Sequence, residues 1–451
     1  MNWGQFTNAG FICLRNPPAS VLLRTALADV VVVCVEDVVA AVVVPAVLLV
    51  LECVETLLIP CHDCAESDNI FCAMKRILAF FRKEMMLTLS LTAAVAAMAI
   101  TPPDSELLAD IDWRTLGTLF MMLTVLEGFK KENIFAPLIR LSTRFSTLRA
   151  LVLFLVFGVF FTSMFVTNDV SLIIFVPLTI LLLRQADRES FILLVISLEN
   201  IAAVRGSMLT PFGSPQNLFL YGRFGVGAGT FLLHMLPLCA LSALVLVLFI
   251  TVLTRKEKQA ISFTAPQEIE QTYSKPRQIA YIVLFLMVLA VIVTRTRLWY
   301  AAVAVTLAAM LFLDRRILIK TDYVLLATFL CFFIFSSSIA RNADIAEFLS
   351  RLVSGREYWW SIGISQIISN VPAAIVLYPF TQNNAALIYG LDTAGLCSLI
   401  GSLASVINYR LYVRDYPGKG KAFIKVFTLT SWAFLAIVIV PGYLLSFWEF
   451  A

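Results

Sequence analysis

Two short polar motifs interrupt long apolar stretches, and their residue types suit ion binding. The sequence Thr-Asn-Asp at 167–169 lies within the apolar run 150–183, and Ser-Asn-Val at 369–371 lies within the run 359–389. An Asn side chain supplies one acceptor and two donors, and a hydroxyl can face an ion of either charge. The motifs therefore suit a site for small ions better than one for bond making. The candidate ligands are Thr167, Asn168, Asp169, Ser369 and Asn370.

The two motifs begin a longer internal similarity. Residues 167–179 (TNDVSLIIFVPLT) align without gaps with residues 369–381 (SNVPAAIVLYPFT), sharing an Asn, an Ile and a spaced Pro-x-Thr. A Gly-Ser pair follows each motif further along the chain, at 213–214 and at 401–402. This recurrence predicts two repeats, each with the same polar elements.

The Gly-Ser pairs lie in a second kind of polar segment. Residues 210–217 (TPFGSPQN) contain two prolines and a glycine, which argue against a continuous helix because each proline removes an amide donor and clashes with the preceding turn. An unwound segment exposes carbonyl oxygens to a cation, and adjoining helix N-termini offer amides to an anion. The candidate ligands in these segments are Thr210, Gly213, Ser214, Asn217, Gly401, Ser402 and Ser405.

Three charged residues lie within apolar sequence. A carboxylate such as Asp169 at membrane depth costs about 3 kcal/mol or more, so it usually has a coupling-ion, proton or counter-charge role. Glu199 and Arg205 lie in the apolar run 191–209. Arg205 is a candidate counter-charge for an anion, and an ion pair with Glu199 or Asp169 is the alternative. The simpler interpretation of all these polar residues is that they cap helices and join packed helices by hydrogen bonds.

The composition identifies the elements that must position these residues. Of 451 residues, 60% are hydrophobic and 14% are charged, against roughly 25% charged in soluble domains. The chain is therefore predicted to be an all-α polytopic membrane protein. Its net charge of +4 does not indicate a nucleic-acid partner, and two histidines provide little for a His-based metal centre or a Ser-His-Asp enzyme. We expect no enzyme activity, no cofactor and no metal beyond a transported ion.

The apolar stretches and the charges between them predict the topology. About 10–11 spans are expected, at roughly 20 residues per span. Lys and Arg clusters within 130–149, 255–277, 315–316 and 410–421 indicate cytoplasmic loops, whereas the acidic residues between 104 and 112 indicate the opposite side. Arg295 and Arg297 fall on the outer side as exceptions. The chain is expected in the plasma (inner) membrane as a multi-pass protein.

The run 150–183 has basic residues at both ends and a polar centre. Each half has about 17 residues by this division, marginal for a span, so a re-entrant helical hairpin is the favoured interpretation. Polar backbone at that depth is tolerated only inside protein or beside water. Five expected spans lie between the two motifs, which would make the second hairpin open to the other side and the repeats inverted. The predicted divisions are a first repeat, 74–254, a cytoplasmic linker, 255–277, and a second repeat, 278–451.

Residues 1–73 differ from the rest of the chain. They contain six of the nine cysteines, including a CxxC motif at 61–64 that has no second pair to complete a zinc site. Met74 is followed by Lys-Arg and then by an apolar run, as at the start of an inner-membrane protein. We hypothesise that translation begins at Met74 and that 1–73 is an upstream extension, with an additional membrane segment as the alternative. The intact mass of the native protein distinguishes them.

Taken together, four motifs resemble the ion transporter superfamily. The motifs are 167–170, 177–179, 206–217 and 369–372, and the resemblance covers roughly 74–451. It is to permeases with a citrate-transporter-like domain, related to divalent anion/sodium symporters and arsenite or sodium/proton antiporters. The resemblance implies a sodium site at each hairpin tip and broken helix, with substrate between the tips. It also implies a transport domain that moves against a scaffold, which in this superfamily can form a homodimer.

The chain departs from the dicarboxylate symporters of that superfamily, which carry Ser-Asn-Thr at both tips. The third hydroxyl is replaced here by Asp169 and Val371. We therefore expect an elevator-type secondary transporter of a small anion, such as a di- or tricarboxylate, sulfate or a similar oxyanion, coupled to sodium or protons. The alternative is a sodium/proton or arsenite-type antiporter that uses Asp169. Its partners would be the small-ion substrate and the lipid bilayer.

Overall fold

The computed structural model describes residues 84–102, 107–137, 141, 145–257, 274–448 and 450. The predicted extension 1–73 lies outside these residues, as does most of the linker, 258–273. Every element in the described ranges is a helix. In the first half these are α3 (Met85–Ile100), α4 (Leu107–Asp110), α5 (Trp113–Lys131), α7 (Leu148–Val166), α8 (Asn168–Gln185), η1 (Glu189–Phe191), α9 (Ile192–Ser207), α10 (Pro215–Phe224) and α11 (Ala228–Thr254).

The second half contains a similar series of helices. They are α12 (Lys275–Thr294), α13 (Trp299–Asp314), α14 (Arg316–Lys320), α15 (Tyr323–Arg341), α16 (Ala343–Val353), α17 (Glu357–Ile368), α18 (Asn370–Leu377), η2 (Tyr378–Phe380), α19 (Asn384–Ala394), α20 (Leu403–Asp415) and α21 (Gly420–Leu445). The helices agree with the apolar stretches of the sequence, which confirms the all-α fold.

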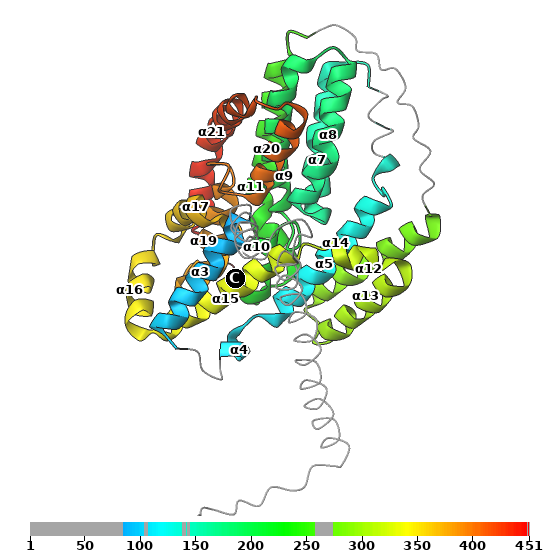
Figure 1. Ribbon diagram of the computed structural model, residues 1–451. Helices are drawn as coiled ribbons and strands as arrows, with labels where there is room; N and C mark the ends of the chain where they lie inside the picture. The colour runs from blue at the N-terminus through cyan, green and yellow to red at the C-terminus, as the bar shows by residue number, and fades with distance from the viewer. Residues whose placement is uncertain are drawn as a thin grey trace, which may run out of the picture. The chain divides into compact units, whose positions relative to one another are not determined.

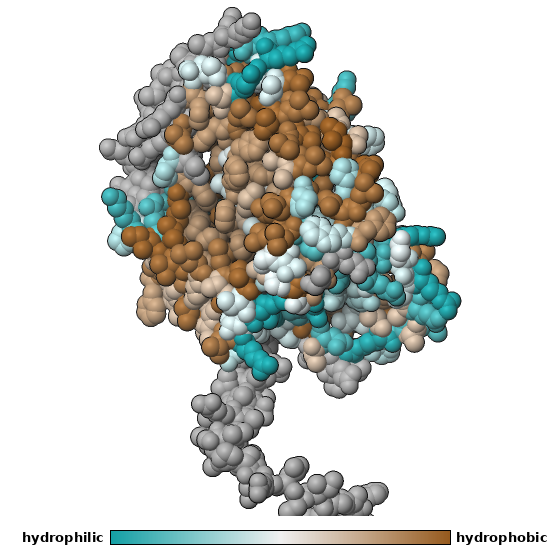
Figure 2. Space-filling view, turned by 180° about the vertical axis from the view of Figure 1, so that it is seen from behind, coloured by the Kyte–Doolittle hydropathy of each residue, from teal (hydrophilic) through white to brown (hydrophobic). Residues whose placement is uncertain are grey.

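The helices have the lengths and surfaces of a membrane protein. Seven in the described residues are long and apolar enough to cross a bilayer, and three shorter apolar helices accompany them. Large apolar side chains are exposed on several of the long helices, including Leu244, Leu286 and Leu429. Figure 2 shows one face on which hydrophobic residues cover a wide area between hydrophilic ends. These exposed apolar side chains suit contact with lipid, so the prediction of a membrane protein is confirmed.

Two helical hairpins occupy the places expected from the polar motifs. Helices α7 and α8 meet at Thr167, and helices α17 and α18 meet at Ser369. The arms of the first hairpin have 19 and 18 residues, each somewhat longer than expected from the sequence. Each hairpin is followed by an interrupted helix, which is α9 then α10 in the first half and α19 then α20 in the second.

The packing of these elements follows the same scheme in both halves. The first arm of each hairpin packs against the interrupted helix of its own half, α7 on α9 and α17 on α19. The second arm of each hairpin packs against the second segment of the interrupted helix in the opposite half, α8 on α20 and α18 on α10. Figure 1 shows α7, α8, α9 and α20 side by side. The second arms thus join the halves.

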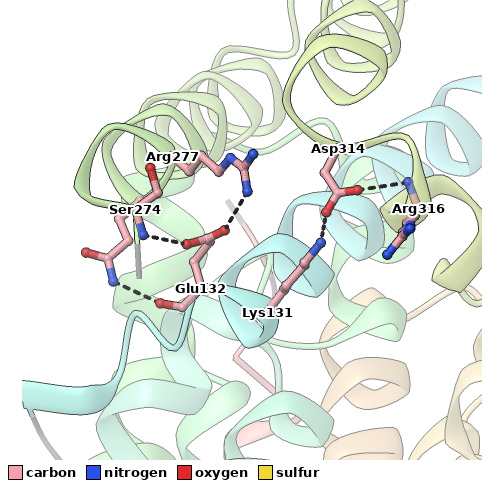
Figure 3. A network of polar contacts seen from close by, with 7 residues as sticks. Lys131, Glu132, Ser274, Arg277, Asp314 and Arg316 are labelled. Atoms are coloured by element: carbon pink, nitrogen blue, oxygen red, sulfur yellow. Dashed lines mark hydrogen bonds and ion pairs between the residues drawn. The ribbon is translucent and has the colours of Figure 1, made fainter. Parts of the chain in front are cut away.

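Ion pairs and hydrogen bonds near the linker join the ends of α5 and α13 and the start of α12. Figure 3 shows Lys131, at the end of α5, paired with Asp314 at the end of α13. Beside it, Glu132 accepts from the backbone N–H of Ser274 at 3.2 Å and lies 3.8 Å from Arg277, at the start of α12. The ends of α5 and α13 therefore lie with the end of the linker, as the basic clusters predict. We call this the linker end of the helices.

Other ion pairs mark the opposite end. Arg223, at the end of α10, lies 3.1 Å from Asp112, which caps the start of α5. Arg341, at the end of α15, lies 2.7 Å from Asp110. The exceptional Arg295 belongs to this end as well, because its guanidinium stacks 3.9 Å from the ring centroid of Tyr221. We call this the acidic end.

The open ends of the hairpins lie at different ends of the helices. In the first hairpin, Arg149 donates to Thr254 at the linker end of α11, at 3.2 Å. In the second, Asn383 follows the hairpin and donates to the carbonyl of Ser446, at the end of α21. The adjoining Trp448 stacks on His234 near the start of α11, the acidic end. The first hairpin therefore opens toward the linker end and the second toward the acidic end.

The first hairpin stops short of the acidic end. Helix α11 has 27 residues and is about 40 Å long, whereas α8 has 18 residues and is about 27 Å long. The tip reaches the interruption between α9 and α10, and the ten residues of α10 continue from there to the acidic end. This length difference is what a re-entrant hairpin requires.

Candidate functional site

Both hairpin tips reverse the chain through one residue with positive φ. Thr167 has φ 74° and ψ 153°, and Ser369 has φ 70° and ψ 160°. Only five non-glycine residues in the described part of the chain have positive φ. Such backbone costs about 1–3 kcal/mol and persists where the surroundings impose it. The two residues are also the first aligned pair of the sequence repeat, so the repeat preserves an uncommon backbone conformation.

Each tip is bonded to the interruption of its own half. The backbone N–H of Asn168 donates to the carbonyl oxygen of Gly213 at 3.2 Å. In the second half, the N–H of Asn370 donates to the carbonyl oxygen of Gly401, also at 3.2 Å. The side chains of both Asn residues are buried. The structure thus brings each predicted tip together with the predicted Gly-Ser pair of the same repeat.

Both glycines lie where no side chain fits. A Cβ on Gly213 would lie 2.2 Å from the carbonyl oxygen of Ser207, the last residue of α9. A Cβ on Gly401 would lie 2.3 Å from the carbonyl oxygen of Ala394, the last residue of α19. In each half the chain therefore folds back tightly onto the end of the helix it has just left. This close approach presents the glycine carbonyl to the hairpin tip.

The remaining predicted ligands lie around these interruptions. Thr210 donates through its hydroxyl to the carbonyl of Met164, in the last turn of α7. The amide of Asn217 donates to the carbonyl of Met208 at 3.2 Å and closes the first interruption. Ser214 and Ser402 are the N-cap residues of α10 and α20, and both are extended and buried.

Arg205 connects the two halves. Its Nη1 donates to the main-chain carbonyl of Asp392 at 3.2 Å, and the Asp392 carboxylate accepts from Gln216 at 3.1 Å. Both charged side chains are buried, Arg205 completely. Arg205 and Asp392 occupy equivalent positions, each two residues before the end of its helix, α9 or α19. The sequence suggested Glu199 or Asp169 as the partner of Arg205, but within the described ranges its hydrogen bonds go to Asp392 and Met208.

Asp169 lies in the first turn of α8, directly after the tip. Its backbone N–H donates to the side-chain oxygen of Asn168 at 2.9 Å. One carboxylate oxygen, Oδ1, is buried without a hydrogen-bond partner in the part of the chain that the structure describes. The position is near the positive end of the α8 dipole, which favours a negative charge.

Glu199 lies deeper along α9, away from the tips. Its Oε1 accepts from the hydroxyl of Thr179 on α8, and its side chain is completely buried. On the next position, Asn200 donates to the hydroxyl of Ser405 on α20 at 3.0 Å. Ser405 is therefore placed with α9, not with the tip of the second hairpin. These contacts form a polar seam between α8, α9 and α20.

The arrangement brings helix ends of both signs to the interruptions. The N-termini of α8 and α10 meet at Gly213, and those of α18 and α20 meet at Gly401. Helix N-termini carry partial positive charge and unpaired amides, which favour an anion. The last carbonyls of α9 and α19 lie beside them and favour a cation. Around each interruption, helix ends that favour an anion therefore lie beside helix ends that favour a cation.

Sequence reasoning missed three buried polar residues, Gln216, Asp392 and Asn408. Asp392 lies between two apolar runs, and Asn408 lies in the middle of α20, just before Tyr409 and Arg410. The amide of Asn408 donates to the carbonyl of Ile196 at 2.7 Å. A carboxylate between two apolar runs was the available signal for Asp392. Asn408 gave none, because its partner lies in a distant part of the sequence.

The chain is similar in sequence to known membrane transport proteins. A family model described as "Citrate transporter" matches residues 76–401. The inner membrane protein YbiR of Escherichia coli (strain K12) is 31% identical over 308 residues, covering 67% of this chain and 81% of that protein. The uncharacterized transporter MJ0456 of Methanocaldococcus jannaschii is 29% identical over 306 residues, covering 67% and 81%.

A solved structure is also similar. It is the Alcanivorax borkumensis YdaH transporter, with a TM-score of 0.43 and 14% identity, covering 81% of this chain and 96% of that one. A likeness at that level is too weak to bear on mechanism. The family match and the two sequence relatives suffice to confirm the expectation of a transporter, not an enzyme.

Proposed function

The chain belongs to the citrate transporter family, and we propose that it is a secondary active transporter of a small anion. The substrate would be a di- or tricarboxylate, sulfate or a similar oxyanion, and the coupling ion would be sodium or a proton. We further propose that the protein resides in the plasma membrane. The observation that carries this proposal is the matched pair of tips, each hydrogen-bonded to a glycine carbonyl in an interrupted helix.

The substrate site in this proposal lies between the two tips. Four helix N-termini, those of α8, α10, α18 and α20, supply positive dipole ends for an anion. Arg205 supplies a fixed positive charge next to the first interruption, and two of its nitrogens, Nε and Nη2, lack hydrogen-bond partners among the described residues. The second tip offers fewer amides than the first, because Pro372 in the first turn of α18 has no N–H.

The mechanism we propose is an elevator movement of inverted repeats. Opposite opening of the hairpins and the exchange of second arms support an inverted relation between the halves. The hairpins and interrupted helices would move together, because their backbones are bonded at the tips. A scaffold containing α5, α12 and α13, which pack on one another, would stay in place and form the interface of a homodimer.

A second candidate function is a sodium/proton or arsenite-type antiporter. The Oδ1 of Asp169, buried without a partner in the described part of the chain, favours it because a carboxylate at a tip can exchange a proton for a cation. In this mechanism no transported anion would be needed.

Thermal stabilisation of the detergent-purified protein tests these functions. The panel is sulfate, phosphate, succinate, citrate and arsenite, each in sodium and in choline at two pH values. A ligand that binds only the folded state raises the melting temperature. A shift with an anion that requires sodium supports symport and gives the substrate class. A sodium shift without an anion response, larger at high pH, contradicts anion symport and supports the antiporter.

A further inference from the structure

We propose that the seam between α8, α9 and α20 contains a separate site for a monovalent cation, sodium or a proton, centred on Glu199. The site goes beyond the ions expected at the tips. Glu199 lies eight residues before the end of α9, about 12 Å from the first interruption. Its ligands come from helices that all pack on one another.

Glu199 is a buried carboxylate with no counter-charge in the part of the chain that the structure describes. Its side chain has no exposed surface, and no ion pair among the described residues includes it. Its one hydrogen bond comes from the Thr179 hydroxyl, and its other oxygen, Oε2, has no partner within the described ranges. An unpaired buried carboxylate is costly and normally acquires a proton or a cation.

Two further oxygens of the seam are buried without a partner among the described residues. Asn408 uses its amide nitrogen on the carbonyl of Ile196, which leaves its Oδ1 buried and without a described partner. Asn200 uses its amide nitrogen on Ser405, and its Oδ1 is likewise buried and unpartnered in the described chain. Both side chains are completely buried. Carboxylate, amide and hydroxyl oxygens are the ligands of hard cations.

Another buried glutamate shows the contrast. Glu132, at the linker end, is 5% exposed but accepts from the N–H of Ser274 and lies beside Arg277. Its charge is thus compensated by protein groups. Glu199 has no such compensation in the part of the chain described, although it is more deeply buried. The difference indicates that the charge of Glu199 is balanced by an ion that enters from solution.

The site also connects the mobile parts of the proposed transporter. Thr179 belongs to the second arm of the first hairpin, Glu199 to the interrupted helix of the first half, and Asn408 to that of the second half. A cation bound between them would stabilise the packing of α8 and α9 on α20. Its binding is therefore visible as stability, without any anion.

The test is the melting temperature of purified full-length protein with sodium chloride titrated against choline chloride, at an acidic and an alkaline pH and without added anion substrate. Glu199→Gln keeps the shape and the bond from Thr179 but removes the charge. For a sodium site, sodium raises the melting temperature of the wild type, and Glu199→Gln loses this rise. For a proton site, acidification in choline chloride raises the melting temperature of the wild type, and Glu199→Gln loses that response. The matched control, Glu132→Gln, keeps the wild-type responses.

The proposal is overturned if the melting temperature of Glu199→Gln still responds to sodium and to pH as that of the wild type does. It is also overturned if the variant melts at a lower temperature in every condition but responds by the same amounts. A wild type that responds to neither sodium nor pH overturns it as well. Asn408→Ala removes a ligand oxygen while leaving Glu199 in place. This variant should need a higher sodium concentration, or a lower pH, to reach half of the increase in melting temperature. The same titration on Asn370→Ala separates this site from the transport site. That variant, altered at the second tip, keeps the response that depends on Glu199 even where anion-dependent stabilisation is lost.

Discussion

The tight approach of Gly213 to the end of α9 predicts a large effect of one added methyl group. In Gly213→Ala, the Cβ would lie 2.2 Å from the Ser207 carbonyl oxygen, below the 3.0 Å that real Cβ contacts keep. The obstruction is backbone, so it cannot rotate away. The segment must move by about 0.8 Å, the difference between these two distances.

That movement acts directly on the hairpin tip. The carbonyl of Gly213 accepts from Asn168 at 3.2 Å, and a displacement of 0.8 Å directed away from the tip would lengthen this contact to about 4.0 Å, beyond a hydrogen bond. Overpacking costs about 1–3 kcal/mol, and the lost bond adds about 1 kcal/mol. These costs destabilise the folded protein, so we expect a lower melting temperature, and we expect weaker uptake because the tip is displaced.

Gly222→Ala is the matched control for this substitution. Gly222 lies in α10, and its Cβ would meet only Thr115 Oγ1, at 3.8 Å. Replacing this helical glycine should stabilise the protein by about 0.5–1 kcal/mol. Melting temperature and uptake into proteoliposomes measure both variants. The repeat makes the same prediction for Gly401→Ala, with Gly363→Ala as its control, because Gly363 has open space around it. Equal behaviour of Gly213→Ala and Gly222→Ala would refute the role assigned to the close contact.

Two further substitutions test the charged groups of the site. Asp169→Asn removes the carboxylate at the first tip and should abolish the pH dependence of transport in proteoliposomes, whereas retained pH dependence would exclude Asp169 as the proton carrier. Asp392→Asn keeps an acceptor for Gln216 and the main-chain carbonyl that binds Arg205, but it removes a buried carboxylate near Arg205. It should lower stability in unfolding measurements by less than the roughly 3–5 kcal/mol that breaking a buried ion pair costs. Adding Arg205→Met should restore part of that loss, and a double variant no more stable than Asp392→Asn would contradict a charge interaction between the two residues.

The parts of the site that sequence could predict are those with local signals. Two prolines and a glycine so close together in residues 210–217 disfavour a continuous helix, and the observed interruption falls between α9 and α10. A polar motif in the middle of an apolar run indicates either a reversal of the chain or a ligand-binding site, and both motifs form hairpin tips. The aligned Thr167 and Ser369 predicted a shared geometry, and their backbone angles agree closely.

The parts that sequence could not predict depend on contacts between distant segments. Arg205 bonds to Asp392 across 187 residues, so its partner could not be chosen from neighbours such as Glu199. Hairpin lengths were also underestimated, because Asn168 begins α8 and the polar tip occupies little more than Thr167. Asn408 joins Ile196 across 212 residues and gave no local signal.

The halves of this protein share backbone geometry but differ in the charges placed on it. Equivalent positions carry Arg205 in the first half and Asp392 in the second, and the first tip carries Asp169 where the second has Val371. Repeated backbone supplies matched dipoles, which suit the single anion that we propose between the tips. Unmatched side chains make the two ion environments chemically different, so a coupling ion is expected to bind the halves with different affinity. Substitutions at equivalent glycines should therefore have similar effects, whereas substitutions at equivalent charged positions should not.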